Sequence, residues 1–171
     1  EGKGIILLSV HYTTIEVGAA AISTVWDRDG MYRAHNNPIY DFIQIKGRLH
    51  KSTGNSRLYE RRDVRGTMKA LKAGRTVWYA PDQDYGIKQG VFAPFFGIQA
   101  ATVYATARLA DKTGATVVPF THVRLPGKQG YKITVHPVLE DFPTGDDVAD
   151  AARVNSLVES FVRLQPEQYL W

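Results

Sequence analysis

The sequence contains no cysteine among its 171 residues. Disulfide bonds, thiolate-bound metals and a thiol nucleophile are therefore excluded, and a reducing compartment is permitted without being required. No uninterrupted apolar run approaches the roughly 20 residues that cross a bilayer, and the first residues lack the pattern of a signal peptide. Any nucleophile that the chain itself supplies must be an oxygen or a nitrogen.

Acidic residues are scarce in one segment of the chain. From Lys46 to Arg75 there are ten lysines and arginines but two acidic residues, a net charge of +8, whereas the whole chain carries +4. Such a segment attracts phosphorylated substrates, acidic carrier proteins or anionic lipid headgroups, although a solvated helix face has the same composition. Aromatic residues are not interleaved with these cations as in RNA-binding segments, so nucleic acid is not an expected partner.

Strand and helix patterns alternate along the chain, without repeats or low-complexity linkers. A hydrophobic content of 44% is enough for one core in a chain of this length. We therefore expect one α/β domain with a central mixed β-sheet flanked by helices. The expected strands are residues 5–10, 76–80, 115–120 and 131–135, and the expected helices are residues 13–23, 39–45, 64–71, 98–109 and 148–162.

His11 and Glu16 lie where the first expected strand runs into a helix. Open α/β sheets usually hold their ligands at the carboxyl ends of strands, which is where His11 stands. If Thr13 is the N-cap, Glu16 completes a T-x-x-E capping box and needs no further role. Across the turn, Glu16 could instead hold the imidazole while the other ring nitrogen takes a proton from a substrate hydroxyl. The spacing alone leaves both interpretations open.

Asp82 and Asp84 form a D-x-D pair in the expected loop 81–90. Two carboxylates separated by one residue can hold Mg²⁺ or Mn²⁺, as in metal-dependent glycosyltransferases, and an aspartate after proline also commonly caps a turn. The phenylalanines between residues 92 and 96 fit either a core or the lining of an acyl tunnel. His122 and His136 have no partner pattern and are interpreted as structural.

Several blocks of sequence resemble one protein family in their order and spacing. His11 and Glu16 match the H-x4-D/E signature of glycerolipid and lipid A acyltransferases. More specific blocks are YRAHNNPIYDFIQIKGR, MKALKAGRTVWYAPDQDYG, VFAPFFG, VVPF and PEQYLW. Together they are similar to the lipid A biosynthesis acyltransferases of the lauroyl and palmitoleoyl type, within the lysophospholipid acyltransferase-like superfamily.

This resemblance implies a glycerolipid acyltransferase-like fold, with residues 1–171 as a single acyltransferase domain. Family members carry a membrane helix before this region and a short basic tail after it. The implied reaction moves a fatty acyl chain from an acyl carrier protein thioester to a hydroxyl of a Kdo-bearing lipid A precursor. It would take place at an anionic membrane surface, on the cytoplasmic face of a Gram-negative inner membrane, without cofactor or metal. A lysophospholipid or another glycolipid as acceptor, and a non-catalytic lipid-binding module, are the alternatives.

The resemblance also assigns roles to residues. His11 matches the general base, Glu16 its acidic partner, and Arg48 an arginine that would pair with Glu16 or stabilise the oxyanion. Arg48 also fits a solvated charge in the basic segment. Asp82 and Gly86 stand where glycerolipid enzymes have an acceptor motif, so Asp82 is assigned to the acceptor, with no metal. Further candidates for acceptor binding are Asp84, Arg33 and Asn37, although Asn37-Pro38 is equally a plain turn.

Overall fold

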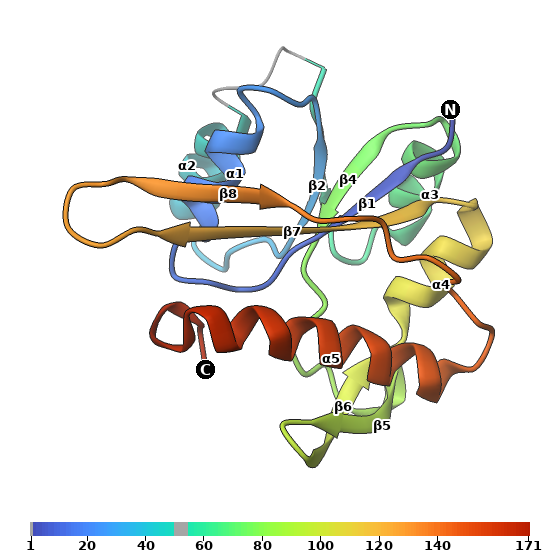
Figure 1. Ribbon diagram of the computed structural model, residues 1–171. Helices are drawn as coiled ribbons and strands as arrows, with labels where there is room; N and C mark the ends of the chain where they lie inside the picture. Colours follow the sequence, from blue (N-terminus) through green and yellow to red (C-terminus); the bar gives the residue numbers. More distant parts are fainter. Residues whose placement is uncertain (1, 50–54) are drawn as a thin grey trace.

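The computed structural model describes residues 2–49 and 55–171. Its strands in the main sheet are β1 (Ile5–Leu8), β2 (Asp29–Tyr32), β3 (Leu58–Glu60), β4 (Thr76–Tyr79), β7 (Thr116–Arg124) and β8 (Tyr131–Val135). They form one sheet in the order β3-β2-β4-β1-β7-β8 (Figure 1). The pairs within β3-β2-β4-β1-β7 are parallel, and β8 is antiparallel to β7. The prediction of a central mixed sheet is confirmed.

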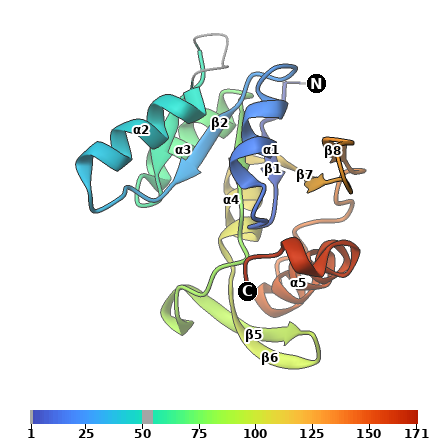
Figure 2. The same ribbon diagram turned by 90° about the vertical axis from the view of Figure 1, so that its left-hand side faces the viewer.

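Helices cover both faces of this sheet. α1 (Ile15–Ile22) packs on one face, and α3 (Val64–Lys72), α4 (Ala105–Thr113) and α5 (Asp147–Leu164) lie on the other. The central strand β1 supplies both cores, because alternate side chains of a strand point to opposite faces. Leu7 joins the smaller cluster with Ile22 of α1, and Ile6 and Leu8 join the larger cluster with the other three helices. α2 (Pro38–Leu49) projects from the body of the molecule (Figure 2).

The segment expected as a helix from residue 98 is different in the structure. Ile98–Val103 is strand β6, which pairs with β5 (Gly90–Phe95) as an antiparallel hairpin, and the helix α4 begins only at Ala105. The turn between the strands holds Phe96 and Gly97 at positive φ, 48° and 79°. Ladder hydrogen bonds to β5 outweigh the helical spacing of the apolar residues. Gly114 ends α4 in the left-handed conformation, as predicted.

The predicted capping box at Thr13 is absent. α1 begins at Ile15, and its N-cap, Thr14, makes no capping hydrogen bond. The Thr14 hydroxyl instead bonds the ring and the backbone carbonyl of His122 on β7. A contact to a neighbouring strand thus replaces the local cap, and Glu16 is left free of a capping role.

The connection between β2 and α3 is more ordered than its turn signals suggest. α2 is longer than the expected helix 39–45 and contains twelve residues. Asn37 caps it, since its side-chain oxygen accepts a hydrogen bond from the backbone N–H of Ile39. Lys51 of the basic segment lies outside the described residues. Within the described part of the chain, no helix has the length and apolar character needed to span a bilayer.

Candidate active site

His11 and Asp82 form a close pair at the carboxyl ends of two neighbouring strands. β1 and β4 are parallel, with Leu8 opposite Tyr79, so the loops that follow them leave the sheet side by side. Nδ1 of His11 lies 2.6 Å from Oδ1 of Asp82, and the backbone N–H of His11 donates to Oδ2 at 2.7 Å. Both carboxylate oxygens therefore hold one residue. Nε2 of His11 makes no hydrogen bond to any described residue.

The Asp82 carboxylate is almost completely covered, whereas the imidazole reaches solvent. The side chain of Asp82 is 2% exposed and that of His11 is 22% exposed. Tyr12 and Tyr169 lie close by, and burial together with the negative charge of Asp82 raises the pKa of both phenols. These tyrosines remain protonated, and Asp82 is the acidic side chain in contact with His11. A buried carboxylate on one ring nitrogen orients the ring and stabilises a positive charge on it.

The last residues of the chain hold the loop that carries His11. The backbone N–H of Leu170 donates to the carbonyl of His11, and the N–H of Thr13 donates to the carbonyl of Gln168. Tyr12 and Tyr169 form an isolated antiparallel bridge between these two hydrogen bonds. The block PEQYLW, distant in sequence, therefore helps to position the imidazole.

Glu16 pairs with Arg48 rather than with His11. The guanidinium of Arg48 donates to both oxygens of Glu16 through Nε, at 3.2 and 3.1 Å, and through Nη2, at 2.6 Å. The Arg48 side chain is 11% exposed, so it is not a solvated surface charge. The predicted contact between Glu16 and the imidazole is wrong, because Asp82 occupies Nδ1. The structure contains the pairing of Arg48 with Glu16, which was one of the two roles expected for Arg48.

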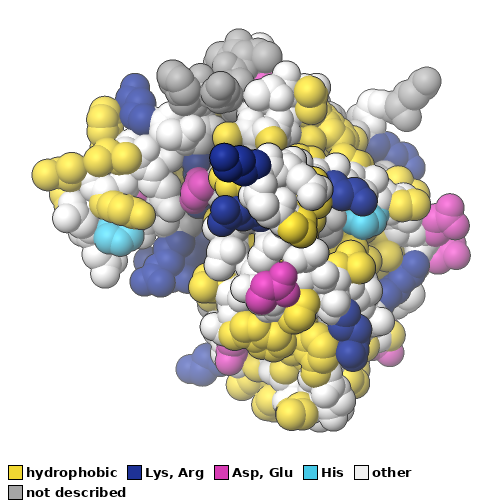
Figure 3. Space-filling model, turned by 60° about the vertical axis from the view of Figure 1, so that its left-hand side comes forward, with side chains coloured by type: hydrophobic (Ala, Val, Ile, Leu, Met, Phe, Trp, Pro, Cys, Tyr) yellow, Lys and Arg dark blue, Asp and Glu magenta, His cyan; other side chains and the backbone are white. Residues whose placement is uncertain are grey.

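A cavity of about 910 Å³ brings these two pairs together, since His11 and Arg48 both line it. Apolar and aromatic side chains such as Met68, Trp78 and Tyr104 form much of the wall. Among the described residues, the lining contains no carboxylate, and its six cations are Arg33, Arg48, Arg61, Arg62, Arg108 and Lys112. Figure 3 views the molecule obliquely from the side of α2 and shows Lys and Arg side chains gathered where α2 meets the body. The cavity is suited to an amphipathic anion.

The residues predicted to bind the acceptor divide into two groups. Arg33 lines the cavity. Asn37 caps α2, and Asp84 accepts a hydrogen bond from the backbone N–H of Gly86 in a turn where Gly86 has a φ of 77°. Asn37, Asp84 and Gly86 do not line the cavity. Asp82, also assigned to the acceptor, is turned toward His11 instead.

Two cations of the cavity wall were not predicted from the sequence. Arg108 and Lys112 lie on α4, outside the basic segment, and their spacing of four residues places them on one helix face. Arg108 stacks on the ring of Tyr104, with its central carbon 3.8 Å from the ring centroid, and donates to Asp147. The i, i+4 spacing was the available signal, but it does not show whether that helix face lines a cavity or faces solvent.

The two aspartates of the D-x-D pair have different hydrogen-bond partners in the structure. Asp82 is bound by His11, and Asp84 caps the turn at Gly86. Within residues 2–49 and 55–171, no three His, Cys, Asp or Glu side chains are grouped as metal ligands. The two carboxylates are therefore each bound to a different part of the chain.

His122 lies near the site but is sealed in the core. It is 1% exposed, and its ring nitrogens face the hydroxyls of Ser9, at 3.1 Å, and Thr14, at 2.9 Å. A Cβ at Gly18 would lie 2.3 Å from the ring, so only glycine permits this packing. Burial is the main cause that lowers the pKa of His122 from 6.5 to about 4. The structural interpretation of this histidine agrees with these contacts.

The free energy of unfolding is expected to fall in acid because of His122. The unfolded chain binds a proton here below pH 6.5 and the folded chain only near pH 4, so this stabilisation is complete above pH 6.5 and is lost as the pH falls toward 4. At about pH 5 the expected loss is about 2 kcal/mol relative to neutral pH. Urea denaturation of the wild type and of His122→Gln will measure it. Equal pH slopes in the two proteins would contradict the assignment.

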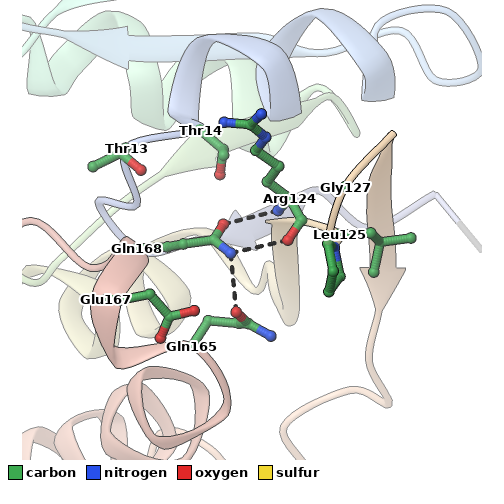
Figure 4. A pocket seen from close by; sticks show the side chains of 9 residues that line it. Thr13, Thr14, Arg124, Leu125, Gly127, Gln165, Glu167 and Gln168 are labelled. Atoms are coloured by element: carbon green, nitrogen blue, oxygen red, sulfur yellow. Dashed lines mark hydrogen bonds between the residues drawn. The ribbon is translucent and has the colours of Figure 1, made fainter. Parts of the chain in front are cut away.

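A second, shallower pocket of about 360 Å³ lies beside the loop that carries His11. Figure 4 shows Gln168 of η2 (Pro166–Gln168) reaching the end of β7, where it bonds the backbone of Arg124 twice. Gln168 also donates to the side chain of Gln165. The side chains in this pocket therefore fasten the C-terminal segment to the sheet, and they offer no pair of the His11–Asp82 kind.

Comparison with known proteins supports one family. A family model described as bacterial lipid A biosynthesis acyltransferase matches residues 1–171. The chain is 41% identical over 99% of its length to an Escherichia coli protein named lipid A biosynthesis lauroyltransferase. It is 36% identical over its full length to another E. coli protein, named lipid A biosynthesis palmitoleoyltransferase. The matches cover 55% of each relative, so the chain spans about half the length of the curated relatives that it matches.

A solved structure has the same fold. The 1-acyl-sn-glycerophosphate acyltransferase of Thermotoga maritima matches 98% of this chain and 67% of its own, with a TM-score of 0.54 and 16% identity. This likeness concerns the fold alone, and it confirms the predicted glycerolipid acyltransferase-like architecture. Because the family model covers every residue and the E. coli relatives align along nearly the whole chain, the protein belongs to the bacterial lipid A biosynthesis acyltransferases.

Proposed function

We propose that this chain carries the catalytic site of an acyltransferase that acts on a lipid A precursor. The donor would be a fatty acyl thioester of acyl carrier protein, and the acceptor a hydroxyl of a Kdo-bearing precursor at the cytoplasmic face of the inner membrane. The observation that carries the proposal is the His11–Asp82 pair in the wall of a cavity lined by six cations. The names of the E. coli relatives support the choice of lipid A chemistry.

In the proposed reaction, His11 acts as general base and then as general acid. Nε2 takes the proton of the acceptor hydroxyl while the hydroxyl oxygen attacks the thioester carbonyl carbon. The tetrahedral intermediate collapses by breaking the carbon–sulfur bond, and the imidazolium returns the proton to the leaving thiolate. Asp82 stabilises the imidazolium between these steps. The enzyme forms no covalent intermediate, because the acceptor itself is the nucleophile.

Arg48 is suited to stabilise the oxyanion. Its Nε and Nη2 are engaged by Glu16, and its Nη1 makes no hydrogen bond to a described residue. A guanidinium fixed through one edge presents its other edge with little further loss of side-chain freedom. Glu16 is then a positioning residue that acts through Arg48, in place of the predicted role on His11.

The cations of the cavity are expected to bind acceptor phosphate. In the double variant Arg61→Gln/Arg62→Gln, the acceptor KM should rise about tenfold, because two phosphate-binding charges are lost. Raising the salt from about 0.05 M to about 0.5 M should narrow the difference in KM between the variant and the wild type, since salt screens the attraction that Arg61 and Arg62 provide only in the wild type. Steady-state kinetics with varied acceptor will measure both effects.

A control variant with the same loss of charge can be made in α3, which follows Arg61 and Arg62 in the chain. Lys69 and Lys72 of α3 are exposed and do not line the cavity. Lys69→Gln/Lys72→Gln removes the same charge from the basic segment and should change the acceptor KM less than about twofold. If the two double variants behave alike, net charge and not the cavity determines acceptor binding.

The proposed function is tested by mass spectrometry of products. The chain is incubated with a mixed pool of acyl carrier protein thioesters and the Kdo-bearing precursor, and the acceptor should gain the mass of one acyl group. Acylation of a lysophospholipid in place of this precursor would favour the alternative acceptor. Lipid binding without transfer would favour a non-catalytic module, and a strict requirement for Mn²⁺ or Mg²⁺ would favour the D-x-D interpretation.

A further inference from the structure

α2 has the reverse of the usual orientation for a helix on a globular protein. All of its residues are described, and none is buried. Its apolar side chains point outward: Ile39 is 71%, Tyr40 55%, Phe42 60% and Ile43 59% exposed. A surface helix ordinarily turns its apolar stripe to the core and its polar residues to water.

The polar side of the same helix faces the protein. At 100° per residue, the four apolar side chains of α2 span an arc of about 160°, and Gln44 and Arg48 lie on the opposite side. Gln44 and Arg48 line the cavity, and Arg48 is bound to Glu16 of α1. The outward apolar face is therefore a consequence of how the cavity wall is built. In Figure 3 this apolar surface forms the lobe that projects beyond the body.

Positive charge accompanies this apolar face. Of the two cations of α2, Arg48 is bound to Glu16 and lines the cavity, and Lys46 is left on the outward side. Lys46 lies on the apolar arc, with its ammonium 5.5 Å from the centroid of the Phe42 ring. The carboxylate of Asp41 accepts a hydrogen bond from the backbone N–H of His35 and lies away from the apolar arc. A lysine whose stem covers apolar surface and whose charge reaches outward is suited to an anionic lipid headgroup.

We infer that α2 inserts Ile39, Tyr40, Phe42 and Ile43 into the interfacial layer of a bilayer that carries anionic lipid. The inference rests on the proposed function, because a lipid acceptor is what requires the cavity to face a membrane. A bilayer matches both features of the surface: apolar side chains enter the acyl boundary, and Lys46 meets the phosphates. Because Gln44 and Arg48 of α2 line the same cavity as His11, insertion of α2 places the cavity next to the headgroups.

Vesicle binding tests this inference without any acyl donor. The 171-residue chain is sedimented with vesicles of phosphatidylcholine and phosphatidylglycerol in a ratio of about 3:1, and its partition coefficient is measured. In the triple variant Ile39→Gln/Phe42→Gln/Ile43→Gln, the partition coefficient should fall at least about tenfold, because three apolar side chains that enter the bilayer are lost. Glutamine retains a high helix propensity, and circular dichroism confirms folding.

The matched control lies across the molecule. Tyr131, Val135 and Val138 have exposed fractions of 46%, 47% and 46%, and β8 lies on the opposite side from α2 in Figure 2. Their triple replacement by glutamine should change the partition coefficient less than about twofold. Equal binding by the α2 triple variant and the wild type would overturn the inference, as would a wild type that does not bind these vesicles.

Insertion depth gives a measurement that is independent of the triple variant. The added fluorescence of Phe42→Trp, relative to wild type, should be quenched by lipids brominated in the acyl chain, and that of Val135→Trp should not. An unquenched tryptophan at position 42 would overturn insertion. Acyl transfer to a detergent-solubilised acceptor separates the two proposals: transfer without vesicle binding rejects the inference and keeps the function, and binding without transfer does the opposite.

Discussion

Replacing His11 with alanine is expected to lower kcat for acyl transfer about a thousandfold. The substitution removes the nitrogen that takes the proton of the acceptor hydroxyl, and positioned general bases contribute roughly 10² to 10⁴ to rates of this kind. KM should change little, because the cations of the cavity remain. Initial rates with a detergent-solubilised acceptor measure the loss, and added imidazole should restore part of the rate.

Controls separate lost chemistry from lost structure. His11→Ala leaves one oxygen of the buried Asp82 carboxylate without its partner, so the melting temperature should fall, and circular dichroism at the assay temperature checks that the variant is folded. His35 lies outside the cavity, and His35→Ala should keep the wild-type rate in detergent. A His11→Ala enzyme that retains a tenth of the wild-type kcat without imidazole would reject general-base catalysis at this residue.

Asp82→Asn is expected to lower kcat about a hundredfold or more, although the side chain keeps its shape. The carboxamide can donate a hydrogen bond to Nδ1 of His11, and Nε2 then carries the proton and cannot act as a base. The negative charge that stabilises the imidazolium is lost as well. Glu16→Gln should also lower kcat, by roughly tenfold or more, through its effect on the position of Arg48.

Double-variant cycles distinguish which carboxylate serves the imidazole. If Asp82 acts through His11, then adding Asp82→Asn to His11→Ala should cost almost nothing further, because the two residues act as a unit. Glu16→Gln should likewise cost nothing further in Arg48→Gln. The effects of Asp82→Asn and Glu16→Gln should multiply. If Glu16→Gln is instead without effect in His11→Ala but costly in Arg48→Gln, Glu16 serves the imidazole during turnover and the pairing in the structure is not the catalytic one.

Local sequence patterns were sufficient to predict secondary structure where the stabilising contacts are local. The apolar run at residues 5–10 predicted β1, and the glycines at 74 and 114 marked the ends of α3 and α4. Patterns failed where a distant partner decides the conformation: residues 98–103 form a strand because β5 pairs with them, and Thr14 bonds His122 in place of capping its helix. Propensity at such positions is weaker than the hydrogen bonds that tertiary structure supplies.

The sequence by itself determined the family, the alternation of strands and helices, and the position of a histidine at the end of the first strand. Only the tertiary structure decided which acid contacts this histidine. Asp82 is 71 residues from His11 in the chain and reaches it because β1 and β4 are adjacent, and no periodicity in the sequence encodes that adjacency. Glu16, five residues from His11, is instead drawn to Arg48 on α2. The charged cavity has the same origin, since its cations converge from the loop after β2, from α2, from the turn before α3 and from α4.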